Sequence, residues 1–245
     1  CAVEQVVARG ELIVDEGRLT RELPAPSYSG LLLDTVRLPR IEAEDLVIRV
    51  DQEAKRARVR VIGASPISLL TESLEYELPV RDGVIQPDLE NDILHIACVE
   101  RYGKNGSIGR SFIKNFGLKS GAVAISVGHD HHNVTVTGTD SYDMALAVNR
   151  IQELQGGLVY VNQGQVMAEI ALPICGLLAD EDGDVVAEQL RAVIAAMAEE
   201  GCTIPSPNVT LSFITLIFIP ELAISDQGLF DVNTFQIIDP VIEVM

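Results

Sequence analysis

Residues 99–138 read VERYGKNGSIGRSFIKNFGLKSGAVAISVGHDHHNVTVTG, and this stretch decides what we expect of the whole chain. It holds three of the four histidines, a glycine-rich polar loop and two runs in which apolar and polar residues alternate. Alternation with a period of two is typical of β-strands, because successive side chains point to opposite faces of a sheet. Imidazoles, a carboxylate and an amide crowd together at residues 129–133, so we expect any functional site at this turn.

The composition predicts a globular protein with an aliphatic core. Of 245 residues, 47% are hydrophobic, 22% are charged and only 4% are aromatic. The formal net charge of −18 argues against nucleic acid and anionic membrane surfaces as partners. We expect no signal peptide and no transmembrane segment, and therefore a cytoplasmic protein.

The four cysteines are widely spaced and form no CxxC motif. Cys98, Cys175 and Cys202 lie in apolar surroundings, which predicts reduced core residues rather than disulfides. The sequence given starts at Cys1, which we interpret as a fragment boundary. The alternative is a processed N-terminal cysteine that acts as the nucleophile of a self-activating amidohydrolase.

Alternation and turn residues predict many short strands. Hairpins are expected at residues 3–19 (with its turn at 15–17), 74–84 and 158–170, and further strands at 31–38, 46–50, 56–62, 111–118, 122–127, 133–137 and 235–238. A loop or linker is expected at residues 23–28, because it contains Pro24 and Pro26.

Three segments predict helices. The first covers residues 88–101 and includes His95, with Asp88 as its cap. The second is capped by Asp140, with Asp143 completing a capping box, and the third covers residues 184–200. The class of residues 210–219 stays open. Strands joined mostly by turns, with about three helices between them, predict an α+β fold with a mixed or mainly antiparallel sheet.

The turn at residues 129–133 allows three interpretations. If the strand continued, His129 and His131 would share one face, which suits Zn, Mn or Fe. A metal needs further ligands, and His95 is the only other imidazole, so carboxylates would have to complete the set. The other interpretations are a polar surface turn and a site contribution without direct metal ligation.

Residues 103–110 resemble a phosphate-binding loop in composition but lack the GxxxxGK[ST] pattern, so we interpret them as a flexible turn.

Several motifs, in one order, resemble the C-terminal region of bacterial and archaeal adenine deaminases. They include ERYGKNGSIG at 100–109, FGLKSGA at 116–122, HDHHN at 129–133 and IPEL at 219–222. The similarity extends from residue 65 to residue 230. This sequence departs from the family pattern at Tyr102, where the family has His, at His131, where it has Ser, and at residues 207–209.

The resemblance implies an enzyme of the amidohydrolase superfamily whose metal-bearing barrel converts adenine to hypoxanthine and ammonia. This chain has one HxH and no histidine after His132, so the barrel is expected upstream of Cys1 or on another polypeptide. The divalent metal, Mn or Fe, is expected on that barrel and not in this chain. Residues 1–40 would then form the closing strands of a small β-sandwich plus a linker, and residues 41–245 the adenine deaminase C-terminal domain.

The resemblance and the crowding of polar groups together suggest which side chains reach the barrel mouth. The candidates for substrate binding or for orienting other site groups are His129, Asp130, His132, Asn133 and Glu100. We expect no catalytic residue within this chain, which alone would be inactive. The expected partners are the barrel domain, adenine and further copies in a homo-oligomer acting in adenine catabolism and purine salvage. The alternative is a non-catalytic binding or regulatory module derived from this domain.

Overall fold

The computed structural model describes residues 3–22 and 26–245. Cys1, the alternative nucleophile, and part of the expected linker at residues 23–28 lie outside the described residues. The strands are β1 Val6–Ala8, β2 Glu11–Asp15, β3 Arg18–Leu19, β4 Arg56–Gly63, β5 Glu72–Arg81, β6 Val84–Ile85, β7 Ile93–Val99, β8 Ile108–Lys114, β9 Ala122–Ile125, β10 Val134–Gly138, β11 Gly157–Asn162, β12 Gln165–Ala171, β13 Leu222–Ser225, β14 Gly228–Asp231, β15 Gln236–Ile238 and β16 Val241–Val244.

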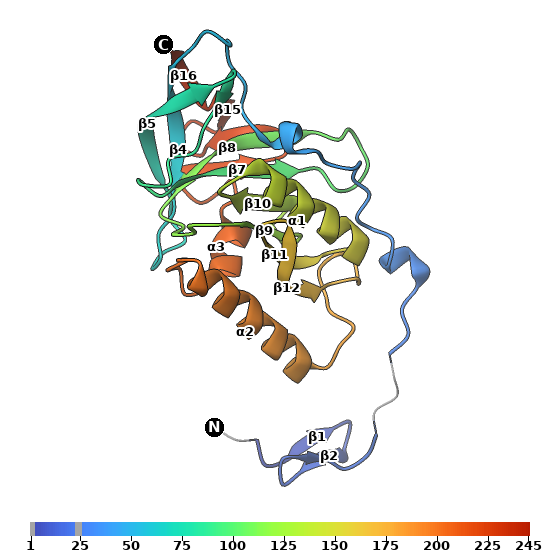
Figure 1. Cartoon of the computed structure of the whole chain (residues 1–245). Coiled ribbons are helices and arrows are strands. Elements are labelled where there is room, and N and C mark those ends of the chain that lie inside the picture. The colour runs from blue at the N-terminus through green and yellow to red at the C-terminus, as the bar shows by residue number, and fades with distance from the viewer. Residues whose placement is uncertain (1–2, 23–25) are drawn as a thin grey trace.

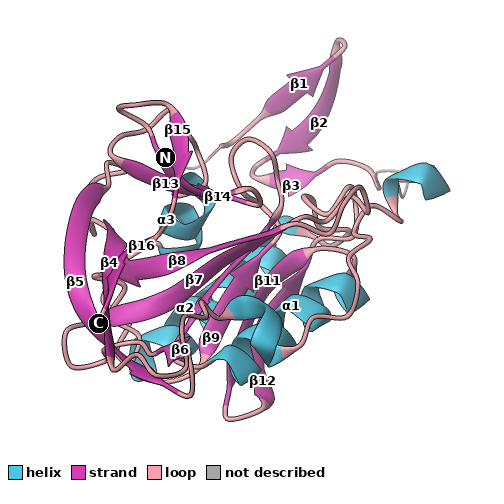
Figure 2. Ribbon diagram, turned by 90° about the horizontal axis from the view of Figure 1, so that it is seen from above, coloured by secondary structure: helices cyan, strands magenta, loops and turns pink. Residues whose placement is uncertain are grey.

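A ten-stranded sheet forms the centre of the fold (Figure 1, Figure 2). Its strands follow the order β12-β11-β9-β10-β7-β8-β4-β5-β6, and β16 pairs with β4. The pairing of β4 with β8 is parallel and the other pairs of this sheet are antiparallel. Together with three α-helices, this sheet confirms the predicted α+β class with a mixed, mainly antiparallel sheet.

The expected helix at residues 88–101 is wrong, because most of this segment is strand β7. All seven residues of β7 are buried, since the strand lies between β10 and β8 and both its faces are covered. A strand buried on both faces reads as a continuous apolar run, which periodicity alone does not separate from a buried helix. Asp88 caps no helix; its carboxylate accepts hydrogen bonds from Asn91 in the turn that precedes β7.

The α-helices cover both faces of the sheet. Helix α1 (Ser141–Leu154) packs on one face, in a core that includes Met144, Ala124 and Val136. Helices α2 (Gly183–Glu199) and α3 (Pro207–Phe213) pack on the other, in a core that includes Val193 and Leu211. Figure 1 shows α1 lying across β9, β10 and β11. The two helices expected after residue 140 are thus confirmed, and the open segment 210–219 begins within α3.

Asp140 caps α1 as predicted, and its carboxylate accepts from the backbone N–H groups of Tyr142 and Asp143. The expected capping box is wrong, because the Asp143 carboxylate is used elsewhere. It accepts from the N–H groups of Gln163 (2.9 Å) and Gly164 (2.8 Å), in the tight turn between β11 and β12. Asp143 therefore ties this hairpin to α1 instead of closing the helix end.

The strands expected at residues 31–38 and 46–50 are also wrong. The segment contains two short 3₁₀ helices, η1 (Gly30–Leu32) and η2 (Ala43–Leu46), and residues 48–50 make only an isolated bridge to residues 83–85. For residues 36–41, amide side chains of α1 and of its C-cap residue replace a strand partner. Asn149 bonds both the N–H and the C=O of Ile41, and Gln155 does the same for Val36.

Two small sheets complete the structure. Strands β1, β2 and β3 form the first, and its turn at residues 16–17 confirms the hairpin expected there, with an additional turn at 9–10. Strands β13, β14 and β15 form the second. Among the helices of the described residues, none is long and apolar enough to cross a membrane.

Candidate functional site

The turn at residues 129–133 joins β9 to β10 and is anchored on the segment around α3. The His129 N–H donates to the Ser212 carbonyl (2.9 Å), and the Thr215 hydroxyl donates to the His129 carbonyl (2.9 Å). The His129 ring packs on Phe213, with ring centroids 4.5 Å apart. These contacts fix the first residue of the turn from residues more than 80 positions away in the chain.

Asn133 fixes the other end of the turn. Its side chain is 4% exposed; Oδ1 accepts from the Arg101 N–H (3.3 Å) and Nδ2 donates to Asp226 Oδ1 (2.9 Å). The second Asp226 oxygen accepts from the Ser107 hydroxyl (2.6 Å). Asp226 therefore joins the turn, the loop after β7 and the β13–β14 hairpin. The carboxylate belongs to one of the resembling motifs, but only the folded chain reveals its partners.

Two of the three departures from the family pattern, Tyr102 and His131, contact each other. The Tyr102 hydroxyl donates to the His131 carbonyl (2.6 Å). His131 Nδ1 accepts from the backbone N–H of Asn133 (3.0 Å). A serine hydroxyl commonly accepts from the N–H two residues ahead in such turns, so the imidazole here occupies the acceptor place that a hydroxyl can fill.

Glu100 turns its carboxylate into the loop that follows it. This carboxylate accepts from the backbone N–H groups of Tyr102 (2.5 Å), Lys104 (2.9 Å), Asn105 (3.3 Å) and Gly106 (3.3 Å). Burial alone would raise the pKa of Glu100, but these donors outweigh it and hold the pKa below its ordinary value. The loop at 103–110, expected to be a flexible turn, is thus wrapped around a buried anion, and Glu100 orders the loop beside the site.

The pKa values of His131 and His132 in the turn lie below the ordinary value. Burial is the largest cause that lowers the pKa of His131, and it outweighs the attraction of Asp226 and Asp130. Burial also lowers the pKa of His132, reinforced by the positive charge of Arg101. His132 Nδ1 and His131 Nε2 are buried without a hydrogen-bond partner in the described chain. Asp130 lies exposed at the tip of the turn.

Arg101 lies beneath the turn with an incompletely paired guanidinium. The residue is 2% exposed, and Nη2 donates to the Cys175 carbonyl (3.0 Å). Nε and Nη1 find no acceptor within residues 3–22 and 26–245. The guanidinium passes so close to Gly176 that a Cβ there would lie 1.7 Å from Nη1. The sequence analysis did not single out Arg101, because nothing in the local pattern marks a buried arginine.

The candidate residues do not fit a metal ion. Within the described ranges, no group of three or more His, Cys, Asp or Glu side chains has the geometry to hold one. His131 Nδ1 is already used as an acceptor inside the turn. The turn therefore offers polar groups for orientation and recognition.

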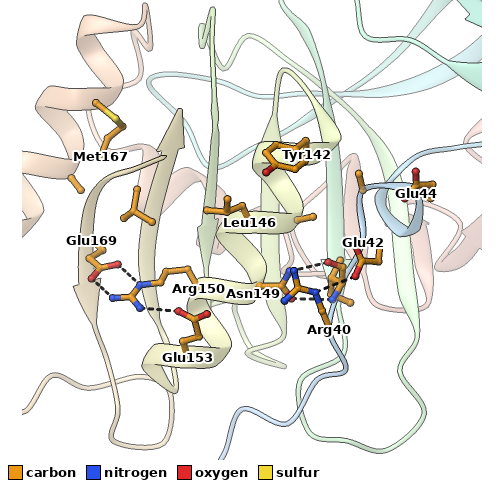
Figure 3. Close-up of a pocket in the computed structure, with 15 residues that line it drawn as sticks. Arg40, Glu42, Glu44, Tyr142, Leu146, Asn149, Arg150, Glu153, Met167 and Glu169 are labelled. Atoms are coloured by element: carbon orange, nitrogen blue, oxygen red, sulfur yellow. Dashed lines mark hydrogen bonds and ion pairs between the residues drawn. The ribbon is translucent and has the colours of Figure 1, made fainter. Parts of the chain in front are cut away.

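A larger cavity than any at the turn lies between residues 40–44, α1 and β12 (Figure 3). Its volume is about 890 Å³. Both arginines of this cavity are paired: Arg150 binds Glu153 and Glu169, and Arg40 binds Glu42, while Glu44 has no ion pair among the described residues. Because the paired arginines are not free to bind a ligand, we place the candidate site at the turn.

The comparisons with known proteins agree with the resemblance. The family model described as the adenine deaminase C-terminal domain matches residues 68–236. Similar proteins are adenine deaminase 1 of Carboxydothermus hydrogenoformans (46% identical, over 98% of this chain and 40% of its own length) and the adenine deaminase of Methanococcoides burtonii (43%, over 91% and 38%). The adenine deaminase of Brucella anthropi is 40% identical over 96% of this chain and 40% of its own length.

This chain spans about two fifths of the length of these curated relatives. The matched family model covers both the loop after β7 and the turn at 129–133, so the candidate site lies inside the shared region. The chain belongs to the family of adenine deaminase C-terminal domains.

Proposed function

We propose that this chain is the C-terminal part of an enzyme that hydrolyses adenine to hypoxanthine and ammonia. Its turn at residues 129–133 would complete the mouth of a barrel domain that the chain does not contain. The names and the greater length of the relatives support this proposal. The divalent metal, Mn or Fe, belongs to the barrel in this proposal, and so does the chemical step. We also propose a cytoplasmic homo-oligomer that acts in adenine catabolism and purine salvage.

One observation carries the proposal: other elements hold the backbone of the turn, while polar side chains of the turn stay wholly or partly exposed. Asn133 and the backbone of His129 are fully engaged with other elements. Asp130 is exposed, and the partly exposed His129 and His132 lie side by side, with ring centroids 5.8 Å apart. A neutral imidazole both donates and accepts, and a carboxylate accepts, so these groups match the ring nitrogens and amino group of adenine. A group orients a substrate when packing and hydrogen bonds hold it in place, as Phe213 and Ser212 hold His129.

The test is single substitution of His129, Asp130 and His132 by alanine in the complete enzyme. We expect kcat/KM for ammonia release to fall about 10–100-fold for at least one of them, as for groups that orient a metal site. Glu153→Ala, in the groove of Figure 3, is the matched control and leaves kcat/KM unchanged. Unchanged kcat/KM in all three turn variants contradicts the proposal.

A second candidate function, a non-catalytic binding module, is supported by the contact between Tyr102 and His131. Tyr102 and His131 both depart from the family pattern and contact each other, which indicates that the two positions changed together. Calorimetry with adenine separates the candidates. Adenine binding to the complete polypeptide without ammonia release favours the module, and ammonia release excludes it.

A further inference from the structure

An apolar groove begins directly beside the turn. It has a volume of about 280 Å³ and lies between α2, α3 and the sheet. His129 and Ser212 line one part of it, and Val209 and Phe213 of α3 form its rim. The Ser212 side chain is 5% exposed, and its hydroxyl finds no partner in the described chain. The groove thus presents aliphatic surface together with one buried, unused hydrogen-bonding group.

The other side of α3 is also apolar and exposed. The loop between β4 and β5 holds Ile67, Leu69 and Leu70, which are 94%, 42% and 57% exposed. Leu69 and Leu70 share a small hollow with Phe213, so the loop and the groove meet at α3. We call the surface formed by Ile67, Leu69, Leu70, Val209, Phe213 and His129 the α3 face.

The α3 face is not suited to contact with water. Isolated exposed aliphatic residues are ordinary, but a continuous apolar surface on a soluble protein marks an interaction site. An isoleucine that is 94% exposed has no stabilising role within this chain. The residues that line the groove and the small hollow include no Asp, Glu, Lys or Arg, although 22% of the sequence is charged. The α3 face therefore has the composition of an interface core, from which charged residues are depleted.

We infer that the α3 face docks the part of the adenine deaminase polypeptide that this chain lacks, through an apolar segment flanked by hydrogen-bonding groups. This inference rests on the proposed function, because the face continues into the turn that would reach the barrel mouth. The relatives' additional length, about three fifths of each, supplies the partner. The docked segment must carry polar atoms beside its apolar ones, because the Ser212 hydroxyl and His132 Nδ1 have no partner in the described chain.

A second copy of this chain is a poorer occupant. Docking of a second copy on this face would bring together two chains of formal net charge −18, and the groove and hollow hold no Lys or Arg to offset that repulsion. Docking within one polypeptide also avoids most of the entropy lost when separate molecules associate. The two occupants differ in one measurable respect, since docking within a polypeptide does not depend on protein concentration.

The experiment measures how fast a maleimide labels single introduced cysteines in the complete enzyme. Ile67→Cys and Val209→Cys lie on the α3 face, where the native side chains are 94% and 39% exposed in this chain. Met167→Cys is the matched control, because Met167 is 54% exposed and lies in the groove of Figure 3. The unsubstituted enzyme gives the background from the native cysteines.

If the face is docked, Ile67→Cys and Val209→Cys react at least roughly tenfold more slowly than Met167→Cys, because a docked surface excludes water and reagent. In this chain alone, Ile67→Cys reacts faster than Met167→Cys. Similar rates at all three positions in the complete enzyme overturn the inference. Protection that disappears on dilution assigns the face to a second copy and also overturns it.

Labelling does not depend on turnover, so the two proposals fail separately. If the alanine variants of the turn keep full activity while the face is protected, the proposed role of the turn is wrong and the docking stands. If the face is fully reactive while those variants lose activity, the docking is wrong and the role of the turn stands.

Discussion

The turn at residues 129–133 and the groove of Figure 3 differ in how completely their polar groups are satisfied. In the groove, Arg150 is paired with two carboxylates, and Asn149 bonds both backbone groups of Ile41. Around the turn, Arg101, His131, His132 and Ser212 each keep buried polar atoms without a partner. The groove of Figure 3 has about three times the volume of the apolar groove beside the turn, yet the unpaired hydrogen-bonding groups lie around the turn.

The difference shows that cavity size is a poor guide to function in this molecule. Buried polar atoms without partners cost stability. Five of the nine such side-chain atoms in the described residues belong to Arg101, His131, His132 and Ser212, and the other four belong to Thr35, His95, Ser111 and Thr135. The groove of Figure 3 is structural, because Asn149 holds the backbone of Ile41 and Arg150 ties α1 to β12 through Glu169. Two changes at the turn test this distinction, and a third tests the buried His95 away from it, from the largest expected effect to the smallest.

Glu100→Ala should lower the free energy of unfolding by about 3–4 kcal/mol, because four backbone N–H groups lose a charged acceptor. The measurement is urea denaturation at pH 7. Glu169→Ala in the groove is the control, and it should cost about 1 kcal/mol because its salt bridge with Arg150 is partly exposed. Equal losses of unfolding free energy in the two variants would contradict the difference between the turn and the groove of Figure 3.

Gly176→Ala should cost about 2–3 kcal/mol. The new Cβ would displace the Arg101 guanidinium beneath the turn, and Gly176 has a φ of +70° that alanine adopts poorly. Gly183→Ala, where a Cβ meets nothing within 4 Å at the start of α2, should change stability by at most about 0.5 kcal/mol. Thermal unfolding of the two variants checks this, and a neutral Gly176→Ala would mean that Arg101 is not held as described.

His95, on the same strand as Val99, should make the fold sensitive to acid. The side chain is 4% exposed, and burial lowers its pKa from 6.5 to about 4, against the weaker attraction of Asp140. The unfolded chain therefore binds the extra proton between pH 6.5 and 4, so stability falls as pH falls through this window, by at most about 1.4 kcal/mol per pH unit. His95→Leu should flatten this part of the curve of unfolding free energy against pH. If the slope of unfolding free energy against pH is unchanged in His95→Leu, the acid sensitivity does not come from His95.

The sequence predicted those elements whose patterns are local. Strict alternation at residues 56–62 identified β4, and Asp140 identified the start of α1. The strand β7 was missed because both its faces are buried, which removes the alternation that marks a strand. The strand expected at residues 31–38 was misassigned because Val36 is bonded by the side chain of Gln155, 119 positions away.

The candidate site was partly visible in the same way. The crowding of His129, Asp130, His132 and Asn133 in one turn is a local feature, so the sequence located them. Their supports are not local: Asp226 lies 93 positions after Asn133, and Thr215 lies 86 positions after His129. The roles of the turn residues in substrate binding stay predictions until the alanine variants are measured.

The carboxylate of Asp226 has a consequence for the history of this domain. Because one side chain bonds both Asn133 and Ser107, a lineage that replaces Asp226 must also find new partners for an amide and a hydroxyl on two other loops. These three positions should therefore change together among related sequences. If residues 129–133 are transferred into a related protein, the turn should keep its conformation only when Asp226 is transferred as well.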